Sequence, residues 1–155
     1  MNVVLKPETR ELVIEREIAA PQEAVFSAWT DPQRAAQWWA PRDFTLLSCK
    51  MDVRPGGHWH RRMRAANGEV FVKRGTYREV VPHERLVFTY TTDFASGTVD
   101  PETVVNLTFL ALGPKRTRLT LWHTGFETDL SRDSHQGGWG GAIDRLDSFC
   151  APAPI

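Results

Sequence analysis

The middle of this sequence is a long run of strand-like segments, and that run leaves few folds open. Between residues 44 and 124, short alternating or β-branched runs are separated by turn residues. Short turns join antiparallel strands, so consecutive strands here are expected to pair in antiparallel fashion. Such a sheet needs its apolar face covered. The only long element available to cover it is a C-terminal segment whose apolar residues recur at helical spacing.

The pattern predicts six strands in this run, over residues 44–53, 58–64, 69–81, 86–92, 102–112 and 116–124. Residues 10–19 also alternate and predict a further strand. Pro21 suits the first turn of a helix that contains Trp29, and Asp31-Pro32 begins a second short helix through Trp38. The order strand, helix, helix, six strands, long helix predicts an α+β fold.

The start of the C-terminal helix is less regular than the rest. Its apolar stripe is clear, and Asp129 or Ser131 could cap its beginning. Each glycine inside a helix costs about 1 kcal/mol relative to alanine, and the stripe is preceded or interrupted by Gly137, Gly138, Gly140 and Gly141. The helix therefore either begins near Gly141 or has a loosely held first turn. A frayed start is favoured over a mobile gate beside Trp139.

Length and charge limit the number of domains and the kinds of binding partner that this chain can have. A chain of 155 residues fits one domain, expected over 1–155 with its core at about 10–150. Nineteen basic residues balance nineteen acidic ones, which disfavours binding to nucleic acid or to an anionic membrane. The sequence shows no membrane-spanning run and no secretory signal pattern, so a cytoplasmic location is expected. Cys49 and Cys150 are expected to be buried thiols rather than a disulfide.

Several local strings, in this order, resemble the activator of heat-shock protein 90 ATPase homologue (AHSA1-like) family of the SRPBCC, START or Bet v 1-like superfamily. They are APQEAVFSAWTDP (20–32), QWWAP (37–41), DVRPGGHWH (52–60), GTYREVVPHERLVFTY (75–90), LTLWHTGF (119–126) and GGWGGAIDRLDSF (137–149). The resemblance implies a helix-grip fold, in which a curved seven-stranded antiparallel sheet grips the C-terminal helix over a hydrophobic cavity. It also implies that superfamily members bind lipids, sterols or polyketides, and that some catalyse cyclisation or hydration.

The expected hairpin around Asn67-Gly68 assigns polar side chains to this cavity. A two-residue loop places His58 opposite Tyr77, and a four-residue loop keeps the same faces. His58, His60 and Arg62 then share a face with Gly75 and Tyr77, which is the cavity side if the family comparison holds. We expect this polar group to orient an acidic or carbonyl-bearing ligand.

The other candidate residues are aromatic. His123 is in phase with Leu119 and Leu121, so it faces the apolar side and is favoured as a satisfied core residue. Of the adjacent Trp38 and Trp39, one is expected to point inward and the other away. The residues expected to contact a ligand are Trp38, His58, His60, Arg62, Tyr77, Tyr90, His123 and Trp139.

These observations predict a protein that binds a small hydrophobic or aromatic molecule without a cofactor. His58 and His60 have the H-x-H spacing of metal ligands, but no third ligand is evident, so no metal is expected. No hydrolase, kinase or dehydrogenase motif is present, and no catalytic residue is assigned. One alternative is a cyclase or hydratase that uses His58 or His123 as a base with Tyr77 or Arg62. Another is a co-chaperone-like module, although a chaperone partner is not expected. Homodimerisation stays open.

Overall fold

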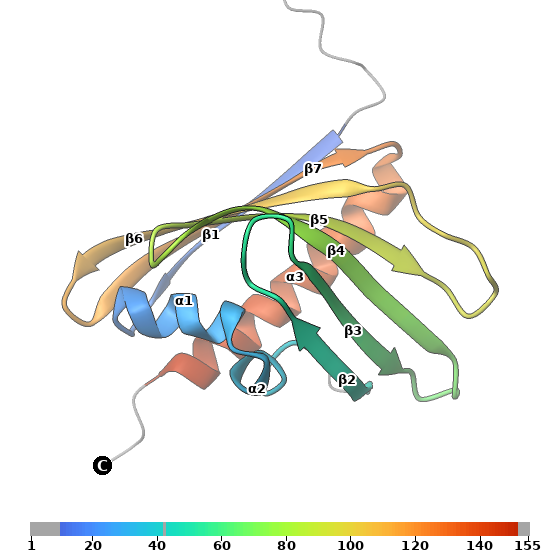
Figure 1. Ribbon diagram of the computed structural model, residues 1–155, viewed down its shortest axis with the longest axis horizontal. Helices are drawn as coiled ribbons and strands as arrows, with labels where there is room; N and C mark the ends of the chain where they lie inside the picture. Colours follow the sequence, from blue (N-terminus) through green and yellow to red (C-terminus); the bar gives the residue numbers. More distant parts are fainter. Residues whose placement is uncertain (1–9, 42, 152–155) are drawn as a thin grey trace, which may run out of the picture.

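A curved antiparallel sheet wraps one face of a long C-terminal helix in the computed structural model, which describes residues 10–41 and 43–151 (Figure 1). Its strands are β1 (Arg10–Ile18), β2 (Thr45–Met51), β3 (His58–Arg64), β4 (Val70–Val81), β5 (Arg85–Asp93), β6 (Thr103–Gly113) and β7 (Arg116–Phe126). The helices are α1 (Gln22–Thr30), α2 (Pro32–Ala35) and α3 (Asp129–Cys150). The seven strands lie in the order β1-β7-β6-β5-β4-β3-β2, and every pair is antiparallel.

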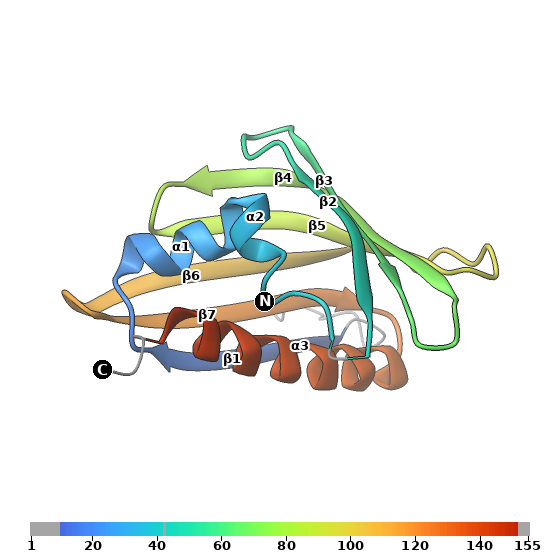
Figure 2. The ribbon, with the colours of Figure 1, turned by 90° about the horizontal axis from the view of Figure 1, so that it is seen from below.

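This arrangement confirms the α+β helix-grip fold. Consecutive hairpins carry the chain from β2 to β7, and β1 then completes the sheet beside β7. Helix α3 contacts β1 and β7, whereas α1 packs on β6 and α2 lies near β2. Figure 2 shows α3 running beneath β1 and β7, while α1 and α2 cover a different part of the same face.

Helix α3 begins earlier than the glycines suggested. Its N-cap is Thr128, whose side-chain oxygen accepts from the backbone N–H of Ser131 at 3.1 Å. The expected caps, Asp129 and Ser131, are therefore wrong, and Gly141 lies well inside the helix rather than at its start. A good cap and the packing of the apolar stripe offset the unfavourable helix propensity of the glycines.

Both Trp38 and Trp39 are buried, at 1% and 5% exposure, so the expectation that one points away is wrong. Helix α2 ends at Ala35, and the chain turns through the following residues instead of continuing as a helix. Helical spacing therefore does not separate the two rings. The Trp38 indole N–H donates to the carbonyl of Ala28 at 3.0 Å, and the Trp39 ring contacts Trp139 edge-on.

The β3–β4 register differs from the expected one by a single residue. Arg64 pairs with Val70, and the N–H of Ala65 donates to the carbonyl of Glu69, which leaves Ala66, Asn67 and Gly68 as the loop. Gly68 adopts a φ of 91°, which a turn with a left-handed third residue requires. A loop with an odd number of residues exchanges the two faces of β3 relative to the two- and four-residue alternatives.

The exchanged faces move the expected polar group out of the cavity. Trp59, Arg61 and Met63 point inward and are each at most 3% exposed. His58 and Arg62 are exposed on the outer face, and His60 is half-buried there. Gly75 and Tyr77 do face inward on β4, as expected.

None of the helices in residues 10–41 and 43–151 is long and apolar enough to cross a bilayer. Both cysteines are free, and both are half-buried rather than buried as the sequence predicted.

Candidate functional site

A cavity of about 310 Å³ lies between the inner face of β3–β5 and the N-terminal half of α3. Its wall is mainly aromatic and apolar, and the principal contributors are Trp39, Phe44, Met63, Phe71, Phe94 and Trp139. The polar groups that reach it include Lys73, Tyr90, Asp100, Ser134 and His135. An apolar wall with a few polar groups is the usual composition of a site for a small organic molecule.

Strand alternation explains how this wall forms. On β4, Phe71 and Lys73 point into the cavity, and the next inward position is Gly75. A side chain there would overlap the carbonyl of Thr89 and approach the Trp59 indole nitrogen to 2.7 Å. Glycine therefore lets strand β5 and the Trp59 ring close over β4. The Phe71 ring is fixed in turn by contacts with Phe44 and Phe94, at 5.9 and 5.8 Å between centroids.

His123 supports the cavity wall from behind. It is fully buried, and its Nδ1 accepts the indole N–H of Trp139 at 3.0 Å. An indole nitrogen can only donate, so the imidazole proton must be on Nε2, which lies 2.6 Å from the Thr103 hydroxyl. That hydroxyl donates onward to the carbonyl of Tyr90 at 2.9 Å. The result is a directed chain of hydrogen bonds that positions Trp139 and Tyr90.

The same surroundings keep His123 neutral. Burial, with smaller effects from the nearby His135 and Lys73, lowers the pKa of His123 to about 2. Since the lone pair on Nδ1 already accepts from Trp139, His123 has no free site from which to take a proton from a ligand.

His135 lies on the cavity wall itself. Its Nδ1 is 2.7 Å from the carbonyl of Ser131, one turn earlier in α3, and therefore donates. Nε2 is then the acceptor of the neutral ring. Burial lowers the pKa of His135, so the neutral form is favoured. His135 lies on the same side of α3 as Trp139, and both line the cavity.

Two basic residues sit on the inner face of the sheet. Lys73 donates to the hydroxyl of Thr92 at 3.0 Å and lies 5.4 Å from the centroid of the Tyr90 ring. Arg61 is 2% exposed, and its guanidinium lies between two indoles, 3.1 Å from the Trp39 centroid and 4.7 Å from that of Trp59. Burial lowers the pKa of Arg61 to about 10, so it stays charged at neutral pH. Arg61 is absent from the residues expected on sequence grounds because the predicted register placed it outside.

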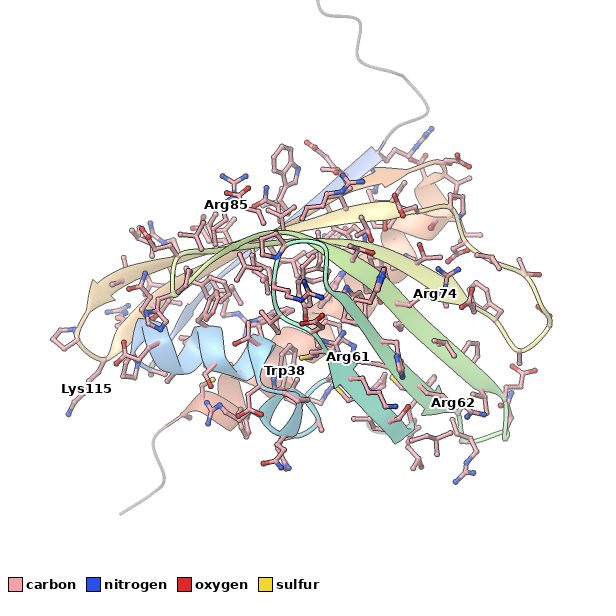
Figure 3. The ribbon with its side chains drawn as sticks, viewed as in Figure 1. Trp38, Arg61, Arg62, Arg74, Arg85 and Lys115 are labelled. Atoms are coloured by element: carbon pink, nitrogen blue, oxygen red, sulfur yellow. The ribbon has the colours of Figure 1, made fainter. Side chains whose placement is uncertain are left out.

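The structure places the eight expected contact residues in three locations. Tyr90 and Trp139 line the cavity. Trp38, Tyr77 and His123 are buried in the core but are not part of the cavity wall. The remaining three, His58, His60 and Arg62, lie on the outer face of β3, where His58 meets the Thr76 hydroxyl at 3.1 Å. Figure 3 labels Arg61 and its outward neighbour Arg62 on the same strand.

A second cavity, of about 200 Å³, shares Tyr90, Asp100 and His135 with the first. Its other lining residues come from the end of β5, the start of β6, the end of β7 and the start of α3, and they include Thr92, Thr103, Phe126 and Ser131. Among the residues that the structure describes, no group of three or more His, Cys, Asp or Glu side chains is placed to hold a metal ion.

A curved seven-stranded antiparallel sheet that grips a C-terminal helix over a cavity defines the helix-grip, or Bet v 1-like, class of proteins. The family model for the Activator of Hsp90 ATPase homolog 1-like protein matches residues 19–151, and the chain belongs to this family. The search among curated proteins gives no significant match.

Solved structures of several bacterial proteins share the fold. A Chromobacterium violaceum protein is 27% identical with a TM-score of 0.76, and the alignment covers 92% of this chain and 99% of that one. The AHSA1 protein of Silicibacter pomeroyi is 25% identical with a TM-score of 0.78, covering 90% and 96%. An uncharacterized Rhizobium leguminosarum protein is 24% identical with a TM-score of 0.78, covering 92% and 94%.

Proposed function

We propose that this protein binds a small hydrophobic or aromatic molecule in the cavity between the sheet and α3. The observation that carries the proposal is the cavity of about 310 Å³ whose wall is built from aromatic rings. That volume lies in the range of small-molecule sites. The START-like fold commonly binds hydrophobic ligands, which supports the same conclusion.

The wall favours a flat apolar body over a polar one. Rings such as Trp39, Phe71 and Trp139 present their faces and edges to the space, and aromatic pairs gain from offset or edge-on contacts. Each square ångström of apolar ligand surface removed from water contributes about 25 cal/mol. Lys73 and His135 provide polar contacts at one side and would set the orientation of the ligand.

Titration with N-phenyl-1-naphthylamine tests this proposal, because this neutral aromatic probe becomes fluorescent when it leaves water. We expect saturable binding to one site. Gly138→Leu should abolish it, since Gly138 lines the cavity and a side chain there has open space to enter. Gly137→Leu is the matched control, because Gly137 is exposed, has equal space and does not line the cavity. Leucine is a good helix former, so neither change should break α3.

Two results would contradict the proposal: absence of saturable binding to the wild type, or equal effects of Gly137→Leu and Gly138→Leu. The proposal keeps the cytoplasmic location predicted from the sequence.

The enzyme alternative gains no support from the two histidines that the sequence suggested as bases. Of the two histidines considered as bases, His58 is exposed on the outer face and His123 has both ring nitrogens engaged. The co-chaperone alternative rests on the family description alone.

A further inference from the structure

Two cations face each other on the inner side of the sheet. Arg61 of β3 pairs directly with Lys73 of β4, and both side chains point toward the helices. Like charges directly opposite in an antiparallel pair destabilise a sheet. In residues 10–41 and 43–151, no carboxylate forms an ion pair with either side chain. The fold therefore places two positive charges side by side on its inner face without an ion pair to either, and the only carboxylate on the wall of the cavity, among the described residues, is that of Asp100.

Arg61 interacts with the Cys49 side chain but is still short of hydrogen-bond acceptors. Its Nε and Nη1 are buried and have no hydrogen-bond partner in the described part of the chain. Buried charged groups in native proteins are normally paired, because an uncompensated charge is strongly destabilising. Stacking on Trp39 and Trp59 provides cation–π attraction but no acceptor oxygen. An acceptor from outside the chain would complete this group.

One ring separates Arg61 from the cavity. Trp39 covers the guanidinium on one side, and it also belongs to the cavity wall. Its backbone is anchored, since Arg145 donates to the carbonyl of Trp39 at 3.2 Å and to that of Trp38 at 2.8 Å. Rotation of the Trp39 side chain would leave these backbone contacts intact, and a ligand that joins Arg61 to the cavity must replace the contacts of this ring with the neighbouring indoles.

We propose that the ligand of this cavity is an amphipathic organic anion, a flat apolar body with one carboxylate or sulfonate group. The anionic group binds Lys73 and, once the Trp39 ring turns aside, Arg61. This inference rests on the proposed function and names the chemical class of the ligand. It also explains why the chain retains a buried guanidinium that an apolar side chain could replace.

The test compares two fluorescent probes that differ by one group. 8-Anilinonaphthalene-1-sulfonate is N-phenyl-1-naphthylamine with a sulfonate added, so their dissociation constants isolate the contribution of the charge. We expect the sulfonate to bind the wild type at least about tenfold more tightly, the range of one charge-assisted hydrogen bond. Displacement of the sulfonate by the neutral probe, and loss of both in Gly138→Leu, should show that they share the cavity.

Arg61→Met and Lys73→Met should each bring the ratio of the two dissociation constants close to one, whatever their effect on the neutral probe alone. Methionine has a similar length, and replacing a buried charge with an apolar residue commonly preserves or increases stability. Arg62→Met is the matched control, because it removes the same charge from the opposite face of the same strand. Its probe preference should equal that of the wild type.

The outcomes separate the two proposals. If both probes bind the wild type equally, or if Arg61→Met and Lys73→Met keep the preference for the sulfonate, the anion site is overturned and the proposed function stands. An equal loss in Arg62→Met also overturns it, since the effect would then be one of total charge. If the sulfonate binds with dependence on Lys73 and Arg61 but the neutral probe does not, the apolar proposal fails and the anion site stands. If neither probe binds, both are overturned.

Discussion

At the residue scale, the hydrogen bonds around His123 hold two walls of the cavity in fixed positions. The Trp139 indole N–H, the imidazole and the Thr103 hydroxyl form a chain in which every donor has one acceptor. Nδ1 of His123 can accept the Trp139 N–H only while it carries no proton. The stability of the fold therefore depends on pH.

We predict that stability falls as the pH drops below about 6.5, the usual pKa of an unfolded histidine. The folded pKa of His123 is about 2, so below pH 6.5 the unfolded chain binds a proton that the native chain does not. Between pH 7 and pH 5 this linkage should cost about 2 kcal/mol. The lowered pKa of His135 acts in the same direction. Urea unfolding at a series of pH values measures the loss.

His123→Gln should be less stable at pH 7 but should lose about 2 kcal/mol less than the wild type on acidification to pH 5. His58→Gln controls for the removal of one imidazole, because this ring lies on the outer face. A pH dependence in His123→Gln equal to that of the wild type would show that the buried imidazole is not its source.

Gly75 should tolerate no side chain. An alanine Cβ would lie 1.8 Å from the carbonyl oxygen of Thr89, a backbone atom that cannot move without breaking the β4–β5 pairing. We expect Gly75→Ala to lower the free energy of unfolding by about 3 kcal/mol, as overpacking in a closed core does. Gly113→Ala, where a Cβ meets nothing within 4 Å, is the control for loss of a strand glycine. Similar small effects of the two changes in denaturant titrations would contradict this account.

At the scale of elements, α3 combines a cap, an apolar stripe and a run of glycines. The cap at Thr128 and the buried residues Ile143 and Leu146 hold the two ends of the helix, while Gly137 and Gly138 lie where the helix is exposed. Glycine at these positions costs conformational entropy when the helix forms. Neither position requires glycine for steric reasons, since a Cβ at either would meet nothing within 4 Å.

Gly137→Ala should therefore stabilise the protein by about 1 kcal/mol through helix propensity alone. Thermal unfolding followed by circular dichroism at 222 nm measures the change. Gly75→Ala should instead lower the melting temperature in the same assay. A decrease in melting temperature for Gly137→Ala would show that this part of α3 needs the freedom of glycine.

The β3–β4 hairpin shows why sequence reasoning located some site residues and missed others. Tyr90 and Trp139 could be predicted because the phase of each is decided within its own element. Arg61 could not, because its side depends on whether Ala66 belongs to the loop, and one residue exchanges the faces. Basic residues occupy both faces of β3, so hydrophobic alternation offered no correction.

At the scale of the whole molecule, the order of elements and the helix-grip architecture were predictable from periodicity, turn residues and the family resemblance. The inward turn of both Trp38 and Trp39 was not, because it depends on where α2 ends and how the chain bends after Ala35. The cavity likewise depends on how rings from distant elements rotate against one another, which no spacing within one segment determines.

The balance of charge predicts how the molecule behaves in solution. Nineteen basic and nineteen acidic residues give no net charge at pH 7, with an isoelectric point near 7.0. Net repulsion between molecules is then at its minimum, so we expect solubility to be lowest near pH 7 and to rise on the alkaline side. Precipitation midpoints in polyethylene glycol between pH 6 and pH 9 measure this. A solubility that does not change with pH would contradict it.

Five of the six tryptophans form one contiguous cluster, in which ring centroids of neighbours lie between 4.7 and 6.5 Å apart. The sixth, Trp122, is 44% exposed on the other face of the sheet. Indoles this close transfer excitation energy to one another, so we expect a change at one ring to alter the fluorescence of the whole cluster. Trp39 belongs both to the cluster and to the cavity wall. The intrinsic tryptophan fluorescence of the protein should therefore change when the cavity is occupied, while the fluorescence of the exposed Trp122 stays constant.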